Sequence, residues 1–570
     1  MAAYFWVGGT GTWDGTGNTQ FAITSGGVAT LLNPTNADTV TFDANSGTAA
    51  TVTVTSTAVS LSTTINKSDI NLSLSGSPTL CTAAGTCTLT TGTITLNTFT
   101  LTIGSFSSNN MNARTIAFGS GNITVTGLSG TVFGGPSSAN TGLTITGTAQ
   151  VNVTGNGTTT RTVNPGNSLA ISAPISFTIS AGSDTINSTA GGTFNNLTFT
   201  SGFTGTFGNV TRSIFGNLTL DASITSFSSG ASTLTFTGTG SRTITTAGET
   251  IDCPITFNGV GGTWQLQDAL TSGDTRTCTL TNGTLNLNDY TLTTGIFSSS
   301  NSNVRTLTTG VGNFILTGNN ATIWNTSTST NLTYTNIPFV DCTYAGAAGS
   351  RTITTSATTP ISANFNSGTD NLILSPAFQD LDFQLFGGTL ANSTRTIYGN
   401  LTLWSAMTTT AGALVTTFSR AIGVTNGING DSSVAAMNFP ITLVDEGTTE
   451  IYAALVLNST SALTMTGGKL FLANSLISTV GSFVTTGTTS KYLGSITPGT
   501  AATISAASGT NTVSYLTIQD SYATGGATWD ALAITNVDAG NNTGWLFSTT
   551  PSIGNEITMR LRSFTQPRRF

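Results

Sequence analysis

Hydrophobic and polar residues alternate in short runs along most of the chain. In one representative segment, Ile94 and Leu96, and then Leu101 and Ile103, stand two positions apart with threonine or a small polar residue between or beside them. This alternation predicts β-strands that have one buried and one solvated face. The runs are punctuated by residues that favour turns, namely Gly92, Asn97, Gly104 and the Ser-Ser-Asn-Asn run at 107–110.

The same segment occurs twice in the chain. Residues 86–127 align without a gap with residues 277–318, at a constant offset of 191. About 25 of roughly 42 positions are identical, which indicates a repeat architecture. A second pair, residues 211–220 and 394–403, matches at an offset of 183. Two different modules recur at nearly the same spacing, so the chain contains a duplicated block of about 190 residues.

The spacing of the turns by itself fits a β-sandwich as well as a solenoid. The long internal repeats favour the solenoid, because stacked repeats bury a continuous core. We therefore predict an all-β, right-handed parallel β-solenoid (β-helix) with internally duplicated blocks and aromatic-rich end caps. No long segment shows the apolar spacing of a helix, so we expect helix to be close to absent.

Aromatic residues gather near both ends of the chain, where an open solenoid core must be covered. Tyr4, Trp6 and Trp13 lie among glycines at the start, and Trp529 and Trp545 lie close to the end. The predicted regions are an N-terminal cap or attachment region at 1–75, repeated solenoid blocks at 76–430, divergent coils at 431–515, and a C-terminal cap with a basic tail at 516–570.

The composition separates this chain from disordered proteins that are also rich in glycine and polar residues. Only 7% of the residues are charged, but 37% are hydrophobic, 30 are Phe, and the net charge of −7 is small for 570 residues. Threonine has a good propensity for the outward face of a strand. We interpret the chain as a folded β protein in which no linker divides the blocks.

The first residues lack the basic and apolar regions of a secretory signal peptide. No apolar run reaches the length of about 18 residues needed to span a membrane as a helix. We expect the protein to be made in a cytoplasm and kept there until assembly, without membrane insertion.

Several motifs give the chain a family resemblance. Residues 4–14 combine aromatic residues with Gly-Gly and Gly-x-Trp-Asp, and residues 38–43 read Asp-Thr-Val-Thr-Phe-Asp. Together with residues 257–271 and 537–547, these motifs resemble Thr/Gly-rich β-solenoid proteins of tailed bacteriophages, generally taken for tail fibres or other virion appendages. The resemblance implies a virion location, other virion structural proteins as partners, a homotrimer, and adhesion to a host-surface glycan or protein. It identifies no active site.

Arginine recurs at equivalent positions of the repeats, usually before Thr and an aliphatic residue. One interpretation is a ladder of exposed cations that binds acidic glycans. The other is that each arginine marks a strand start, with its guanidinium bonded to turn carbonyls or an acid. We favour the structural interpretation, because repetition at equivalent sites is what it requires. The repeat arginines are Arg114, Arg161, Arg212, Arg242, Arg305, Arg351 and Arg395.

The C-terminal segment differs from the rest in being basic, with Arg560, Arg562, Arg568 and Arg569 within about ten positions. We interpret it as an arm that docks on another virion protein, or as simple terminal packing. A nucleic-acid site is less favoured, because the remainder of the chain is acidic and repels phosphate.

The absence of histidine excludes Ser-His-Asp and Cys-His catalysis and histidine-ligated zinc. The five cysteines form no Cys-x-x-Cys pair and are expected as buried apolar residues. A bridge between Cys81 and Cys87 remains an alternative. Cys87 and Cys278 occupy the same repeat position. We expect no cofactor and no metal.

Glycan cleavage would need two carboxyl groups held roughly 5–10 Å apart. The close pairs are Asp380 with Asp382 and Asp445 with Glu446. Asp380 and Asp382 are two positions apart, so on a strand they share one face. We favour a solvated edge over catalysis and predict a protein that is not an enzyme.

Exposed tryptophans could stack on sugars, but we expect the candidates to be buried: Trp264, Trp324 and Trp404. The other functional classes that the sequence leaves open are a capsid decoration protein, a polysaccharide depolymerase, a self-assembling extracellular filament or adhesin, and an ice-binding protein with Thr-x-Thr runs.

Overall fold

The structure is a computed structural model in which the ordered elements are β-strands. The predicted all-β solenoid is confirmed, and the described residues contain no helix, so none that could cross a membrane. The structure describes residues 1–16, 20–136, 141–166, 173–319, 321–347, 349–419, 421, 423–430, 437–444 and 447–549.

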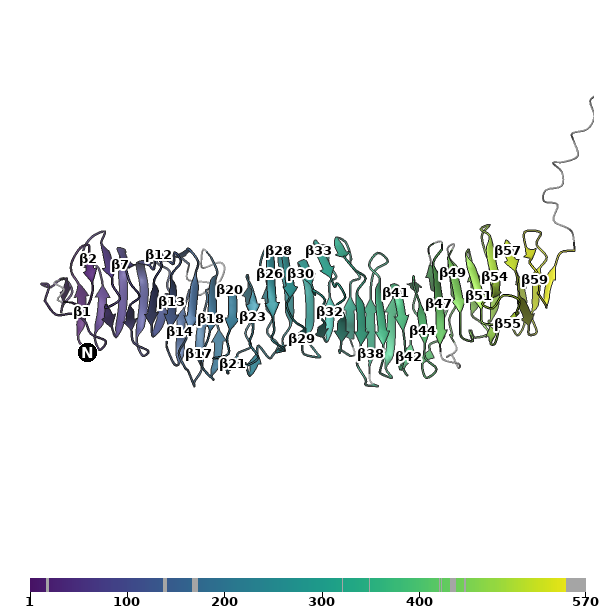
Figure 1. The fold of residues 1–570 in the computed structure, drawn as a ribbon, viewed down its shortest axis with the longest axis horizontal. Coiled ribbons are helices and arrows are strands. Elements are labelled where there is room, and N and C mark those ends of the chain that lie inside the picture. The colour runs from purple at the N-terminus through teal and green to yellow at the C-terminus, as the bar shows by residue number, and fades with distance from the viewer. Residues whose placement is uncertain are drawn as a thin grey trace, which may run out of the picture. The chain divides into compact units, whose positions relative to one another are not determined.

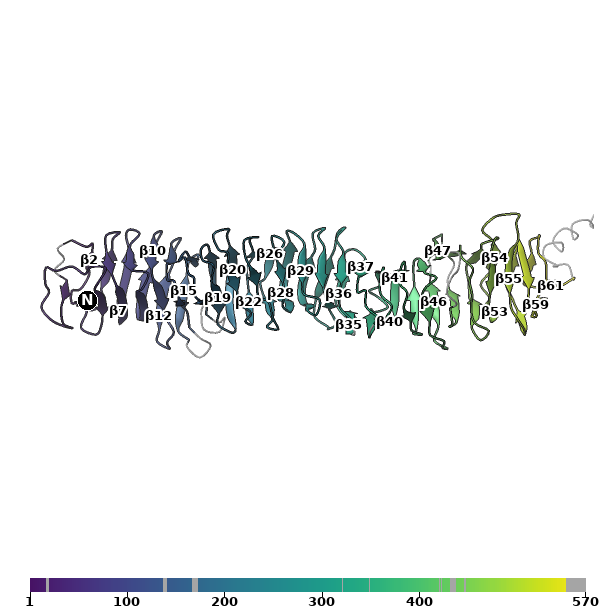
Figure 2. The same ribbon diagram turned by 90° about the horizontal axis from the view of Figure 1, so that it is seen from below.

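The chain divides into two compact units. Unit 1 comprises residues 1–318 and 325–338, and unit 2 comprises residues 319–324 and 339–570. Within each unit, short strands of successive coils pair in parallel (Figure 1). Figure 2 shows the same coils turned by 90°. Regular parallel pairing is already present at β4 (Thr39–Phe42), which pairs with β7 (Ser62–Leu74).

An inward ladder of apolar side chains runs through unit 1. It passes through β10 (Thr100–Ile103) and β13 (Asn122–Val125), where Leu101 lies in register with Ile123. Each member is at most 1% exposed, and burying such a side chain contributes about 1.5–3 kcal/mol. The ladder consists of Leu101, Ile123, Val151, Phe177, Leu197, Leu218, Ile244 and Leu266.

The outward positions beside this ladder are mostly threonine. A β-branched residue with a hydroxyl suits a half-exposed strand surface, because it is stiff, favours the extended backbone and bonds to water. The alternation along the sequence therefore becomes a column of small polar residues, nearly all threonine, across coils. This column contains Thr102, Thr124, Asn152, Thr178, Thr198, Thr219 and Thr245.

The duplicated module folds in the same way in both copies. β9 (Thr86–Thr95) and β30 (Thr277–Asn286) have identical patterns of burial along ten residues. Gly92 and Gly283 lie inside these strands with φ of +92° and +79°. A Cβ at Gly92 would lie 2.6 Å from the Lys67 carbonyl oxygen. Gly92 therefore bends a continuous strand, whereas the sequence predicted a turn there.

The two asparagines that follow these strands form real corners. Asn97 and Asn288 adopt φ of +58° and +51°, a conformation that asparagine tolerates better than most residues. The Nδ2 group of Asn97 donates to the Leu74 carbonyl at 2.7 Å, and Nδ2 of Asn288 donates to the Leu266 carbonyl at 3.0 Å. Each side chain thus fastens its corner to the preceding coil.

The N-terminal end of unit 1 is closed by aromatic side chains, as predicted. β1 (Ala3–Trp6) pairs antiparallel with β3 (Phe21–Ala22). The Phe21 ring lies 5.1 Å from the Trp6 ring and 5.6 Å from the Trp13 ring, in edge-to-face contacts. All three side chains are fully buried, so they cover the open end of the core.

Unit 2 has its own inward ladder, which includes Ala363 of β39 (Ile361–Phe365) and Leu381 of β41 (Ala377–Asp382). Near its C-terminal end, the rings of Trp529 and Trp545 lie 5.0 Å apart and are 2% and 8% exposed. The ladder runs through Ala363, Leu381, Leu401, Ile428, Ile451 and Leu472.

Replacing one inward side chain is expected to destabilise unit 1 far more than replacing its outward neighbour. Phe236 in β25 (Leu234–Phe236) is fully buried and its ring stacks 5.2 Å from that of Phe257. Phe236→Ala should cost about 3–5 kcal/mol, because it leaves a cavity. The matched variant Thr235→Ala, on the outward face, should change stability by at most about 0.5 kcal/mol. Urea unfolding followed by circular dichroism measures both, and equal losses would contradict the assignment of faces.

Candidate functional site

Six of the seven repeat arginines are buried inside the coils. β12 (Arg114–Ala117) and β17 (Arg161–Asn164) are two of the strands that begin at such an arginine. Arg242 differs, because it is partly exposed. Interior guanidinium groups cannot form the exposed glycan ladder, so their role in these six cases is structural. The six are Arg114, Arg161, Arg212, Arg305, Arg351 and Arg395, each at most 3% exposed.

Arg114 and Arg305 occupy the same position in the two copies of the duplicated module, and their partners correspond too. Arg114 Nη2 donates to the Ser108 carbonyl at 2.5 Å and its Nε donates to Ser108 Oγ at 2.7 Å. Arg305 Nη1 donates to the Ser299 carbonyl at 2.6 Å. Burial lowers the pKa of both arginines. Each guanidinium therefore satisfies the carbonyl groups of a corner that turns inward.

Arg161 and Arg351 form a second type of contact, a buried ion pair. Arg161 binds Asp184 through two hydrogen bonds of 2.8 Å, and Arg351 binds Asp370 through two of the same length. All four side chains are fully buried. This two-pronged geometry is the strong form of the arginine–carboxylate interaction.

The sequence interpretation did not identify the acidic partners. Asp184 and Asp370 each end a Gly-x-Asp turn, at 182–184 and 368–370, which follows an arginine by about 20 residues. About 20 residues is the length of one coil, so a Gly-x-Asp turn at this distance after a repeat arginine is the sequence pattern that could have identified Asp184 and Asp370 as its partners.

Arg212 and Arg395 form the third type. Each Nη2 donates to the carbonyl group four residues earlier, at the strand's own corner. The Arg212 guanidinium lies 4.0 Å from the centre of the Phe207 ring, and that of Arg395 lies 5.3 Å from the Phe439 ring. Desolvation by burial lowers the pKa of each to about 10. Neither forms an ion pair with a described carboxylate.

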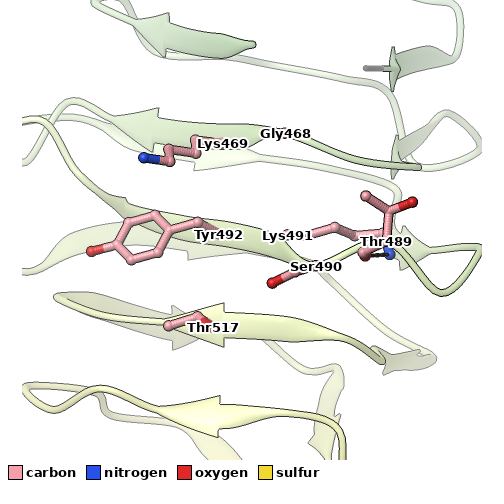
Figure 3. Close-up of a pocket in the computed structure, with 7 residues that line it drawn as sticks. All are labelled: Gly468, Lys469, Thr489, Ser490, Lys491, Tyr492 and Thr517. Atoms are coloured by element: carbon pink, nitrogen blue, oxygen red, sulfur yellow. Dashed lines mark hydrogen bonds between the residues drawn. The ribbon is translucent and has the colours of Figure 1, made fainter. Parts of the chain in front are cut away.

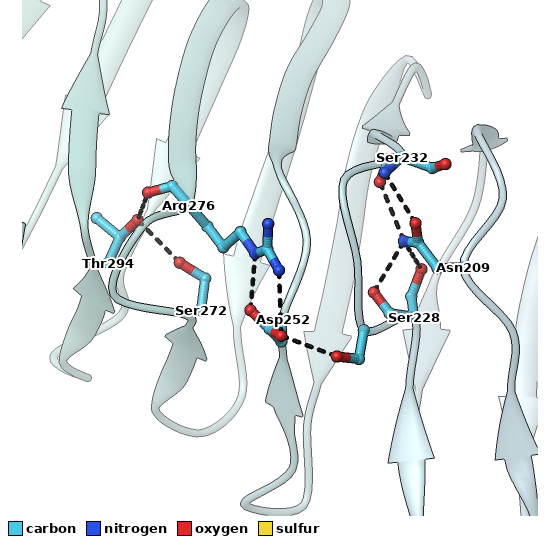
Figure 4. Close-up of polar contacts among 8 residues, drawn as sticks. Asn209, Ser228, Ser232, Asp252, Ser272, Arg276 and Thr294 are labelled. Atoms are coloured by element: carbon cyan, nitrogen blue, oxygen red, sulfur yellow. Dashed lines mark hydrogen bonds and ion pairs between the residues drawn. The ribbon is translucent and has the colours of Figure 1, made fainter.

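At a partly exposed corner of unit 1, an arginine and an aspartate also form an ion pair, but their side chains are in contact with solvent (Figure 4). Arg276 Nε donates to Asp252 Oδ1 at 2.7 Å, and Ser229 Oγ donates to Asp252 Oδ2 at 2.8 Å. The Arg276 and Asp252 side chains are 22% and 34% exposed. The hydrogen bond from Arg276 lowers the pKa of Asp252 and raises the pKa of Arg276.

Asp380 and Asp382 lie in one shallow groove of unit 2, with a volume of about 300 Å³. Asp380 accepts hydrogen bonds from Ser362 Oγ at 2.9 Å and from the backbone N–H of Asn400 at 2.8 Å. Asp382 accepts a hydrogen bond from the backbone N–H of Gln384 at 3.0 Å. The carboxylates thus hold neighbouring strands and a turn in place. Of the other predicted groups, Asp445 and Glu446 lie outside the described residues, as do Arg560, Arg562, Arg568 and Arg569.

The predicted aromatic residues and cysteines are mostly interior. Trp264 and Trp324 are fully buried, so they cannot stack on a sugar, whereas Trp404 is partly exposed. All five cysteines are buried free thiols. In the described part of the chain, no group of three or more Cys, Asp or Glu side chains is placed to hold a metal ion.

A second groove of unit 2 brings together a cation and an aromatic residue (Figure 3). It has a volume of about 380 Å³ and lies over β51 (Lys469–Leu472), β54 (Lys491–Ser495) and β57 (Leu516–Ile518). Lys469 is exposed and lies in register with Tyr492, and both side chains extend to the same side. We call this the Lys469 groove. Its lining residues are Gly468, Lys469, Thr489, Ser490, Lys491, Tyr492 and Thr517.

The two lysines of the Lys469 groove differ in role. Lys491 is 1% exposed, and its Nζ donates to the Thr489 carbonyl at 2.7 Å. Burial lowers the pKa of Lys491. Lys469 forms no ion pair with any described carboxylate, so its charge faces solvent. Lys469 is therefore the cation that a ligand would meet.

The aromatic surface beside Lys469 is formed by two outward side chains. The Phe471 and Tyr492 rings lie 5.2 Å apart, and Tyr492 Oη donates to Gln519 Oε1 at 2.6 Å. Burial raises the pKa of Tyr492. A Cβ at Gly494 would lie 2.7 Å from the Tyr492 ring, so only glycine at this position leaves room for the ring. The sequence interpretation missed this surface, although Phe471 stands at an outward position of the alternation, where an aromatic residue is unusual.

Breaking a buried arginine pair is expected to cost far more than breaking the exposed one. Asp184→Asn leaves the Arg161 charge buried without a counter-charge, so unit 1 should lose about 3–5 kcal/mol. Asp252→Asn removes the exposed partner of Arg276 and should cost at most about 1 kcal/mol. Thermal and urea unfolding of the two variants measure the difference. Similar small losses would show that the Arg161 pair does not stabilise the coil.

Comparisons with known proteins add no assignment to this geometry. No family model matches the chain, and neither any curated protein nor any solved structure matches it.

Proposed function

We propose that the chain is a non-enzymatic structural protein of a phage virion, a tail fibre or related appendage. The observation that carries the proposal is the in-register stacking of coils, whose corners are fastened by buried arginines at repeat-equivalent positions. Such stacks form a stable scaffold from one chain. The resemblance to Thr/Gly-rich β-solenoid proteins of tailed phages supports the virion as the location.

The proposal includes assembly in the host cytoplasm, contact with other virion structural proteins, and a homotrimer. The basic tail, with Arg560 and Arg569 among its four arginines, is the proposed docking arm. A low content of charge, 7% of residues, suits surfaces that pack against copies of themselves with little repulsion.

The Lys469 groove is the proposed contact for the host surface. Sugars present C–H faces that stack on aromatic rings, and hydroxyl groups that accept or donate hydrogen bonds. Tyr492 supplies the ring of the groove, with the Phe471 ring 5.2 Å away beside it, while Lys469 supplies a cation for an acidic sugar. We therefore propose an acidic surface saccharide as the ligand class.

Cryo-electron microscopy of the native particle tests the location. We expect the chain in three or six copies per tail, in a projecting appendage. Many copies distributed over the head would instead establish a capsid decoration protein. Head-to-tail polymers without a particle would establish a filament, and either result would overturn the virion-appendage proposal.

A binding assay with host cells tests the groove. Tyr492→Ala and Lys469→Ala should each weaken binding of the full chain about tenfold, which corresponds to about 1.4 kcal/mol. The matched control is Tyr290→Ala, which removes a tyrosine that is 39% exposed in unit 1 and should leave binding unchanged. Equal effects of Tyr492→Ala and Tyr290→Ala would exclude the Lys469 groove as the contact.

A further inference from the structure

Two thiols meet inside one coil of unit 1. Cys81 is the last residue of β8 (Thr79–Cys81), and Cys87 is the second residue of β9. The two side chains are 0% and 1% exposed, so both point into the core from either side of the corner at 82–85. Both are free thiols in this structure.

The preceding coil shows how closely these two positions converge. Cys81 lies in register with Ser60, and Cys87 lies in register with Thr63. Ser60 Oγ and Thr63 Oγ1 are 2.8 Å apart and hydrogen-bonded. In a parallel ladder each side chain lies over its partner one coil back, about 4.8 Å away. Because the two hydroxyl groups of the preceding coil lie close together, the two thiols stacked over them lie close together as well.

The thiols also interact with each other. A hydrogen bond from the Cys87 thiol lowers the pKa of Cys81, while the same contact raises the pKa of Cys87 well above its usual value. Cys81 is thus the thiol of the pair with the lower pKa, and a lower pKa favours the thiolate, which is the reactive form of cysteine.

The duplicated module provides an internal comparison. Cys278 occupies the position of Cys87, but Ser272 stands where the first copy has Cys81. Ser272 Oγ donates to Thr294 Oγ1 at 2.8 Å, as drawn in Figure 4. Burial raises the pKa of Cys278 to about 12. The same corner therefore exists in two forms, one with two thiols and one with a single, inert thiol.

We propose that Cys81 and Cys87 form an intramolecular disulfide when the folded protein meets a low-molecular-weight disulfide such as oxidised glutathione. The Cys81 thiolate attacks one glutathione sulfur, which gives a mixed disulfide and releases one glutathione. The Cys87 thiolate then attacks Cys81 Sγ and releases the second glutathione. The two thiol protons end on the released glutathiones, and two electrons pass from the protein to the glutathione disulfide.

The bridge would fasten β8 to β9 across their shared corner. A reducing cytoplasm keeps both groups as thiols, whereas an oxidising exterior converts them to the disulfide. The modification follows from the geometry of this corner and does not depend on the proposed virion role.

Peptide mapping of the full chain tests the inference. The protein is incubated with oxidised glutathione well below its unfolding midpoint, where global unfolding is negligible and local opening admits the reagent. It is then denatured, alkylated with N-ethylmaleimide and digested with trypsin without reduction. Cys81 and Cys87 lie in one tryptic peptide, residues 68–114, and Cys278 lies in residues 277–305.

We expect the 68–114 peptide to lose both alkyl groups and two hydrogens, while the Cys278 peptide remains alkylated. In Cys81→Ser, which copies the serine of the second module, Cys87 should remain alkylated like Cys278. The inference is overturned if the wild-type 68–114 peptide stays doubly alkylated, or if it carries two separate glutathiones. The wild-type result decides the question even if the variant does not fold.

Discussion

Parallel, in-register hydrogen bonding between coils is the constraint on which the rest of the structure depends. Once Leu101 pairs with Ile123, the neighbouring side chains of the same two strands lie over their equivalents one coil away. Like therefore stacks on like: apolar residues form inward ladders and threonines form outward columns. The pairing also explains why a chain with so few charges is ordered, because its backbone groups are satisfied by the next coil.

The corners of the coils are where this constraint becomes costly, because carbonyl groups that turn inward lose their contact with water. Buried arginines resolve the problem in three ways. Arg114 donates to corner carbonyls, Arg161 adds a bidentate aspartate, and Arg212 lies on an aromatic ring. Each type appears again about one repeat later, so the duplicated block preserved the solution together with the corner.

The same stacking explains how small differences between repeats create local chemistry. A serine at position 272 gives a corner held by a hydroxyl hydrogen bond, whereas a cysteine at the equivalent position 81 places two thiols together. In unit 2, Lys469 and Tyr492 replace the usual outward threonines, and register brings them side by side. In such a fold, local chemistry therefore arises at positions where a residue differs from its equivalents in the other coils.

The sequence by itself determined the strands, the solenoid and the structural character of six of the seven repeat arginines, because alternation and repetition can be read from the order of the residues alone. It did not determine which side chains meet across coils. Residues such as Arg161 and Asp184 are 23 positions apart, and only the length and register of each coil bring them together. Gly92 shows the same limit at short range, since its positive φ bends a strand that continues through it. Tertiary register decided these contacts because the coils differ in length. Leu101 and its partner Ile123 are 22 positions apart, whereas Ile123 and its partner Val151 are 28 apart, so spacing along the sequence does not identify the partner.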